Sequence, residues 1–153
     1  MKVSFTKMHG LGNDFVFVDG IRWRLPDMKR LAKRLSDRRF GIGCDQLLVL
    51  GKSRRADFKM EIFNADGGKV EMCGNGIRCL GKYVRDEGLT KKSELTVETP
   101  AGIQRIKILT KQRIQVDMGA PVLKGAEIPV KFSGRVINRP LRVEDRQFRV
   151  TCV

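Results

Sequence analysis

Residues 62–79 read IFNADGGKVEMCGNGIRC, and this stretch leads from a strand pattern through a turn into a helix pattern. Before the turn, every second residue is apolar, which predicts a strand with one face made by Phe58, Met60 and Ile62. The turn is expected over residues 64–68, because Asn, Asp and Gly favour tight turns. The helix is predicted to start near Gly76 and to end at Gly88. This order places Cys73 just before the start of a helix.

Cys73 and the glycines beside it are the sharpest chemical feature of the stretch. Gly74 and Gly76 leave backbone N–H groups open to close approach, and a helix N-terminus carries about half a positive charge. An anion can dock on those N–H groups, and a thiol at the same place has its thiolate form favoured. The alternative interpretation is that Cys73 only fills space as a small buried apolar side chain. The flanking glycines favour a reactive thiol beside a carboxylate-binding loop.

Outward from this stretch, strand patterns dominate. Alternating apolar residues on both sides of HGLGND (residues 9–14) predict a β-hairpin. A second helix is predicted from Pro26 to near Arg39, where apolar residues recur three and four positions apart. Further strands are expected at residues 46–50, 95–99, 103–109, 114–118, 128–132 and 141–153. No repeat or linker divides the chain, so we predict one α+β domain of antiparallel strands with two helices over residues 1–153.

Three uncharged amides stand where loops meet apolar strands, namely Asn13, Gln46 and Asn64. An amide can donate through its NH₂ group and accept through its carbonyl, so it can bind either the carboxylate or the ammonium of an amino acid. Each one alone is more often a turn residue. They form a binding site only if the fold brings them together, which periodicity does not show.

The net charge of +14 and the isoelectric point near 10.2 suggest that the protein binds a nucleic acid, an anionic membrane or an acidic partner. The charge is dispersed, however. Lys and Arg outnumber Asp and Glu by 10 to 5 over residues 1–50, by 10 to 8 over 51–100 and by 11 to 4 over 101–153. The basic helix at residues 28–38 has no aromatic side chains that could stack on bases. A basic nucleic-acid-binding module is kept as the alternative function. Because the charge is dispersed and stacking side chains are absent from this helix, we do not expect a nucleic-acid partner.

Metal and membrane chemistry are also not expected. The four cysteines form no CxxC pair and the only histidine is His9, so we predict no metal site. The apolar runs are far shorter than the ~20 residues that cross a bilayer, and the first residues do not form a secretory signal. We expect a cytoplasmic protein.

Four segments, in order, resemble the diaminopimelate epimerase family. They are MHGLGNDF at residues 8–15, RRFGIGCDQLL at 38–48, IFNADGGKVEMCGNGIRC at 62–79 and TPAG at 99–102. Together they span nearly the whole chain and are far more specific than one glycine-rich turn. The resemblance implies one half of a two-domain fold in which antiparallel strands curl around a helix.

The resemblance also implies an activity. The family converts LL-diaminopimelate to the meso form for lysine and peptidoglycan synthesis without a cofactor, and the full-length protein is expected to be a homodimer. One cysteine thiolate removes the α-proton and a second cysteine delivers a proton from the opposite face. By this match Cys73 is one of the two catalytic cysteines. The residues implied to bind the substrate are Asn13, Gln46, Asn64, Gly74 and Asn75.

The second catalytic cysteine of the family has no counterpart that the sequence identifies. Cys79 falls inside the predicted helix, Cys44 in a turn and Cys152 in a late strand pattern, and none of them begins a helix. The pattern at residues 148–153 also stops without turn residues. We therefore expect an N-terminal domain whose C-terminal domain, with the second cysteine, is absent, and which is inactive alone. An isomerase of another amino acid is the remaining alternative.

Overall fold

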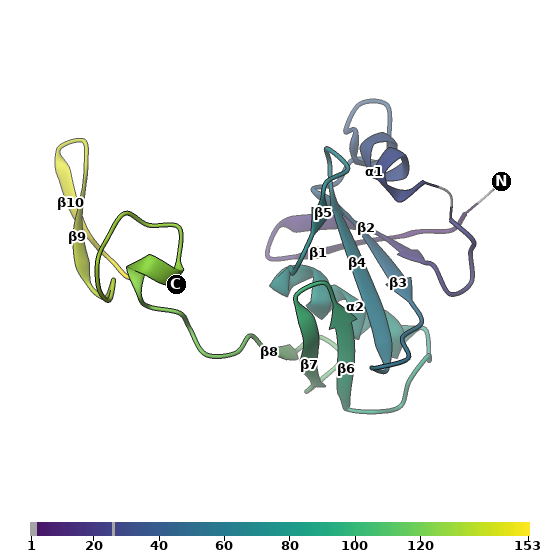
Figure 1. Ribbon diagram of the computed structural model, residues 1–153. Coiled ribbons are helices and arrows are strands. Elements are labelled where there is room, and N and C mark those ends of the chain that lie inside the picture. Colours follow the sequence, from purple (N-terminus) through teal and green to yellow (C-terminus); the bar gives the residue numbers. More distant parts are fainter. Residues whose placement is uncertain (1–2, 26) are drawn as a thin grey trace. The chain divides into compact units, whose positions relative to one another are not determined.

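The computed structural model describes residues 3–25 and 27–153, which form two compact units (Figure 1). The first unit ends at Met118 and the second spans Gly119–Val153, whereas the sequence led us to expect one domain over residues 1–153. Pro26, where the expected first helix begins, lies outside the described residues.

Over the described residues, the first unit consists of one eight-stranded sheet and two helices. Its strands are β1 (Thr6–Gly10), β2 (Asn13–Asp19), β3 (Gln46–Gly51), β4 (Phe58–Asn64), β5 (Lys69–Val70), β6 (Glu94–Thr99), β7 (Gly102–Ile108) and β8 (Ile114–Asp117). Its helices are α1 (Met28–Ser36) and α2 (Gly74–Asp86). The α+β class, the hairpin β1–β2 and both helices are as the sequence patterns predicted.

The sheet is mixed, although antiparallel pairs predominate. Its order is β1-β2-β3-β4-β6-β7-β8, and β5 pairs with β4. Strand β2 runs parallel to β3, and β4 runs parallel to β6. In the sequence, helix α1 lies between β2 and β3, and helix α2 lies between β4 and β6. Such a crossover returns the chain to the same end of the sheet, which parallel pairing requires. Apolar alternation does not encode strand direction, so the pattern alone could not reveal these two pairs.

The two helices cover opposite faces of the sheet. Helix α2 packs on the face that carries Phe15, Leu48 and Ile62, and α1 packs on the face that carries Val16 and Leu47. Successive side chains of a strand point to opposite faces, which is why Phe15 and its neighbour Val16 belong to different cores. Helix α2 contacts β1 at one end of the strand order and β7 and β8 at the other, so the sheet curls around it.

In the second unit, residues 128–132 do not form a strand, contrary to our expectation. Pro129 has no N–H to donate to a strand ladder. The N–H of Val130 donates to the Ile128 carbonyl at 2.7 Å, and that of Phe132 donates to the Val130 carbonyl at 3.0 Å. These short-range bonds use the donors that a neighbouring strand would need.

The last expected strand, residues 141–153, is a hairpin in the structure. Strand β9 (Arg139–Val143) pairs antiparallel with β10 (Arg146–Val150), and Glu144 in the turn has a positive φ of 52°. A single turn of 3₁₀ helix, η1 (Gly125–Glu127), comes earlier in this unit.

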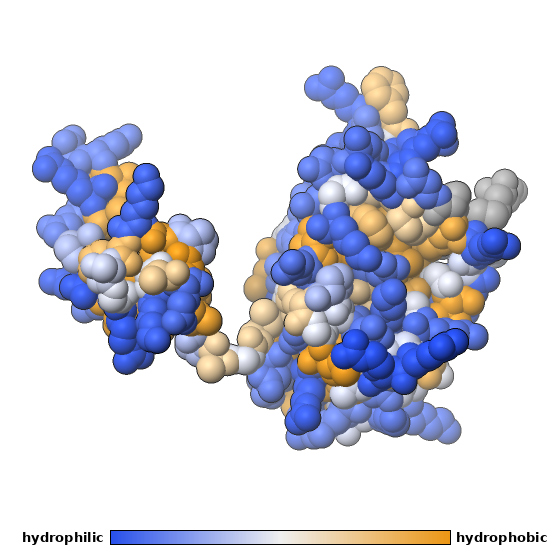
Figure 2. Space-filling view, viewed as in Figure 1, coloured by the Kyte–Doolittle hydropathy of each residue, from blue (hydrophilic) through white to orange (hydrophobic). Residues whose placement is uncertain are grey.

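Hydrophilic side chains cover most of the face shown in Figure 2, with apolar side chains between them on both units. This distribution agrees with the dispersal of charge along the sequence. Among the described helices, none is long and apolar enough to cross a membrane.

Candidate active site

Helix α2 begins at a cysteine. Cys73 is its N-cap with an extended backbone (φ −143°, ψ 109°), and the N–H of Gly76 donates to the Cys73 sulfur at 3.3 Å. The N–H of Ile77 donates to the Cys73 carbonyl at 2.9 Å, so the helix starts two residues before the predicted Gly76. Gly74 and Asn75 lie in the first turn, where N–H groups have no acceptor within the helix. Their amides and the helix dipole provide an anion-binding position next to the thiol.

The Cys73 side chain is partly buried and contacts Asn13, the first residue of β2. The Cys73 thiol donates to Oδ1 of Asn13 over 3.7 Å, and Nδ2 of Asn75 donates to the same oxygen at 3.4 Å. Strand β1 passes close by, because a Cβ atom on Gly10 would lie 3.2 Å from Cβ of Asn75. The fold therefore brings Asn13, Cys73 and Asn75 into one contact group.

Gln46 and Asn64 form a second contact group on β3 and β4. They are register partners, and Nε2 of Gln46 donates to Oδ1 of Asn64 at 2.9 Å. The other polar atom of the Gln46 amide, Oε1, is buried and accepts no hydrogen bond from the described residues. A buried acceptor without a donor costs about 1–3 kcal/mol. This oxygen is therefore suited to accept an N–H from a bound molecule.

Asn13, Gln46 and Asn64 share one face and one end of the sheet. Each continues, by a two-residue step, the row of apolar side chains on its strand that packs against α2. Phe15 on β2 pairs with Gln46, and Gln46 pairs with Asn64, so the three amides stand at neighbouring positions of three adjacent strands. The two contact groups therefore lie on the side of the sheet where α2 packs.

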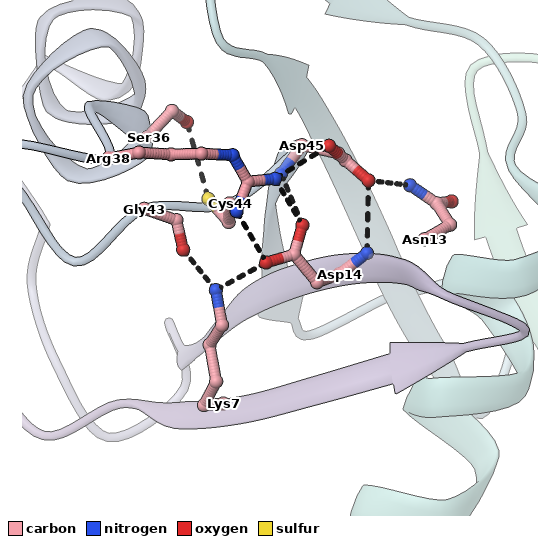
Figure 3. A network of polar contacts seen from close by, with 8 residues as sticks. All are labelled: Lys7, Asn13, Asp14, Ser36, Arg38, Gly43, Cys44 and Asp45. Carbon is pink, nitrogen blue, oxygen red and sulfur yellow. Dashed lines mark hydrogen bonds and ion pairs between the residues drawn. The ribbon is translucent and has the colours of Figure 1, made fainter.

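A network of charged side chains contacts Asn13 (Figure 3). Oδ2 of Asp45 accepts from Nδ2 of Asn13 at 2.8 Å and from the N–H of Asp14 at 3.1 Å. Oδ1 of Asp45 accepts from the Arg38 guanidinium at 2.9 Å. The same guanidinium donates to both oxygens of Asp14, at 3.1 and 2.8 Å, and Lys7 donates to Asp14 at 2.8 Å.

The cations of this network keep the Asp14 carboxylate ionised. Hydrogen bonds from Arg38, and secondly from Lys7, hold the pKa of Asp14 well below its ordinary value, although burial acts in the opposite direction. The Asp14 carboxylate in turn raises the pKa of Arg38. Sequence reasoning did not identify Arg38, Asp14 or Asp45 as part of the site. Their available signal was position, since Asp14 follows Asn13 directly and Asp45 directly precedes Gln46.

The other cysteines have different surroundings. Cys79 is buried in the interior of α2, and this burial raises the pKa of its thiol to about 11. Cys44 is buried on the face that α1 covers, with its sulfur 3.3 Å from Oγ of Ser36. Cys152 belongs to the second unit. Of the cysteines in the described part of the first unit, Cys73 alone is partly exposed at a helix N-terminus.

Comparison with known proteins decides the family. The sequence profile of the family described as "Diaminopimelate epimerase" matches residues 5–124, which include every residue of both contact groups. The chain belongs to the diaminopimelate epimerase family. It is 46% identical over 156 residues to the diaminopimelate epimerase of Acetivibrio thermocellus, and 47% identical over 155 residues to that of Aromatoleum aromaticum. The alignments cover 99% and 100% of this chain and 56% of each relative, so the chain spans about half the length of these diaminopimelate epimerases.

Solved structures support the fold of this family member. A phenazine biosynthesis protein of the PhzF family from Bacillus anthracis is 27% identical, with a TM-score of 0.54 over 70% of this chain and 36% of that protein. Methylitaconate-delta-isomerase gives a TM-score of 0.57 at 17% identity, over 72% of this chain and 36% of that one. A hydroxyproline epimerase from Agrobacterium vitis, solved with bound trans-4-hydroxy-L-proline, gives 0.52 at 17% identity, over 67% and 36%. At 17% identity, the last two show the fold alone.

Proposed function

We propose that this chain supplies the N-terminal domain, and one of the two acid–base cysteines, of an enzyme that converts LL-diaminopimelate to meso-diaminopimelate. The observation that carries the proposal is the position of Cys73, whose thiol lies at the N-terminus of α2 and contacts Asn13. The substrate is inferred from the family to which the profile match assigns the chain. The proposed reaction uses no cofactor and serves lysine biosynthesis in the cytoplasm.

The carboxylate of the reacting centre is proposed to dock on the amides of Gly74 and Asn75. These N–H groups belong to the first turn of α2, and the helix dipole adds to their attraction for an anion. The same donors withdraw electron density from the α-carbon when its proton leaves, because negative charge then spreads onto the carboxylate that they bind. The binding position therefore lowers the barrier as well as orienting the substrate.

The amides of the sheet are proposed to bind the polar groups of the substrate. The free Oε1 of Gln46 can accept from an ammonium group, and this would relieve an acceptor that is buried without a donor. Asn64 is joined to Gln46, and Asn13 contacts Cys73. These contacts support the assignment of all three residues to one substrate site.

In the proposed reaction, a thiolate takes the α-proton, the C–H bond breaks, and its electron pair remains on the α-carbon and its carboxylate. A second thiol then delivers a proton to the opposite face, which inverts the centre. Cys79 and Cys44 are buried in the two cores, so neither is suited to be this second acid. We propose that the second cysteine lies in the part of the family's length that this chain does not match, in a C-terminal domain of a homodimeric enzyme. The 153-residue chain is then inactive alone.

The test joins this chain to the remaining C-terminal part of the Acetivibrio thermocellus diaminopimelate epimerase, of which it matches 56%. Exchange of the α-proton of LL-diaminopimelate in D₂O and formation of the meso isomer are followed by NMR. We expect no exchange with the 153-residue chain, exchange and epimerisation with the joined protein, and neither with its Cys73→Ala variant. Epimerisation by that variant would overturn the proposal. So would an inactive joined protein that folds, if the intact relative is active in the same assay.

A further inference from the structure

The Asn13 amide has each of its polar groups bound by a different partner. Its NH₂ group donates to Oδ2 of Asp45 at 2.8 Å. Its carbonyl oxygen accepts from the Cys73 thiol over 3.7 Å and from Asn75 at 3.4 Å. An ionised carboxylate only accepts hydrogen bonds, so the group that faces Asp45 must be the NH₂ group. Asp45 therefore binds the NH₂ end of the amide, and the carbonyl end contacts Cys73.

Asp45 is itself fixed in place. Its Oδ1 accepts from Arg38 at 2.9 Å, and its Oδ2 also accepts from the N–H of Asp14 at 3.1 Å. Arg38 is held independently by a two-bond contact with the Asp14 carboxylate. The Asp45 side chain is 45% exposed, so packing alone does not hold it and the hydrogen bonds define its position. Figure 3 shows the chain of contacts from Arg38 through Asp45 to Asn13.

We propose that Asp45, anchored by Arg38, is a positioning residue that holds the Asn13 amide with its carbonyl oxygen toward Cys73. This inference rests on the proposed function of Cys73 as an acid–base group. In this orientation Asn13 offers an acceptor to the site, which stabilises the protonated thiol and can receive an N–H of a bound substrate. If the amide turned over, its N–H groups would face the sulfur and stabilise the thiolate instead.

The experiment measures the rate at which neutral iodoacetamide alkylates Cys73 at pH 7, with each cysteine resolved by peptide mass spectrometry. In the Asp45→Ala variant, the NH₂ group of Asn13 loses its acceptor, so the Asn13 amide is free to turn over and place N–H groups toward the sulfur. We expect Cys73 to react about threefold faster, because thiolates and not thiols are alkylated. Asp45→Asn is the conservative variant, whose amide oxygen can still accept from Asn13 and from the N–H of Asp14, so we expect a smaller change than for Asp45→Ala.

Removing a negative charge would also favour a thiolate through space, so a double-mutant cycle separates the two causes. In an Asn13→Ala background, a positioning role predicts that Asp45→Ala accelerates the alkylation of Cys73 less than it does in the parent chain. Asp14→Asn is the charge-matched control, because it removes another carboxylate of the same network. In Figure 3 the Asn13 side chain donates to Asp45 and not to this carboxylate. Asp14→Asn is expected to change the rate less than Asp45→Ala does.

The proposal is overturned if Asp45→Ala accelerates alkylation equally with and without the Asn13 side chain, or if Asp45→Ala does not change the rate in the folded protein. Circular dichroism establishes that each variant is folded. The measurement uses no substrate, so its outcome is separate from that of the epimerisation assay. A failed cycle leaves the function proposed for Cys73 standing, and an inactive joined protein leaves the role of Asp45 standing.

Discussion

Asp14 is a carboxylate held between two cations, Arg38 and Lys7. These partners lower its pKa in the folded chain below the value of about 3.9 that an unfolded chain has. Asp14 therefore contributes stability that is fully present above pH 4 and is lost as the pH falls toward the folded-state pKa. We expect Asp14→Asn to lower the free energy of unfolding at pH 7 and to reduce the loss of stability between pH 5 and pH 3.

Urea unfolding of the parent chain and of Asp14→Asn at pH 7, 5 and 3 measures this difference. The control is Asp145→Asn, which changes an exposed carboxylate in the second unit. It should leave the pH dependence of the first unit unchanged. The same fall in stability on acidification for the parent and for Asp14→Asn would contradict the expectation.

Sequence reasoning found some of the site residues and could not find others. Asn13, Gln46 and Asn64 were identifiable because each is an amide at the end of an apolar alternation, and their roles in binding stay a prediction. The link from Asp45 to Asn13 joins residues that are 32 apart in sequence. It exists because β2 and β3 pair in parallel across a helical crossover, and no local pattern encodes that pairing.

At the scale of an element, Cys73 has two separable tasks, because it caps α2 as well as carrying the proposed chemistry. Its sulfur accepts from the N–H of Gly76 at 3.3 Å. Serine and alanine both lack a thiol, but serine is among the best N-cap residues and alanine among the worst. We expect Cys73→Ala to lower the free energy of unfolding by about 0.5–1 kcal/mol and Cys73→Ser to preserve or raise it.

Chemical unfolding of the three proteins, followed by circular dichroism, measures this difference. The joined enzyme carrying either substitution should fail to epimerise, since capping is restored by serine and the thiol is not. Equal stability of the parent chain and Cys73→Ala would show that the sulfur contributes nothing as a cap. The helix would then be held by its packing against the sheet alone.

The start of α2 was predictable to within two residues, because glycines and an apolar stripe bound the helix in the sequence. The strand expected at residues 128–132 was not, although it has the right apolar alternation. Pro129 removes a ladder donor there, and the neighbouring N–H groups bond to carbonyls two residues back. Apolar periodicity therefore predicts a strand reliably only where backbone donors are left for a partner strand.

At the scale of the whole molecule, the net charge of +14 leaves fourteen cations in excess of the carboxylates. Some ion pairs of the described residues join two exposed side chains, such as Lys82 with Asp86 and Lys107 with Glu94. Others include a partly buried carboxylate, as Arg38 with Asp14 does, and salt screens such pairs less. Exposed pairs of this kind contribute about 0–1 kcal/mol each, so screening them costs little. The repulsion among the excess cations is screened by the same salt, over a Debye length of about 10 Å at 0.1 M.

Repulsion should therefore outweigh the ion pairs, and sodium chloride should stabilise the chain. Between 0.05 and 0.5 M NaCl we expect the Tm to rise by about 3 °C, equivalent to about 1 kcal/mol at this length. Lys111→Glu replaces an exposed cation by an anion in a chain that is strongly positive, so it should raise the Tm at low salt and reduce the response to salt. A Tm that falls as NaCl is added would mean that the surface ion pairs, and not the excess charge, dominate the electrostatic free energy of this chain.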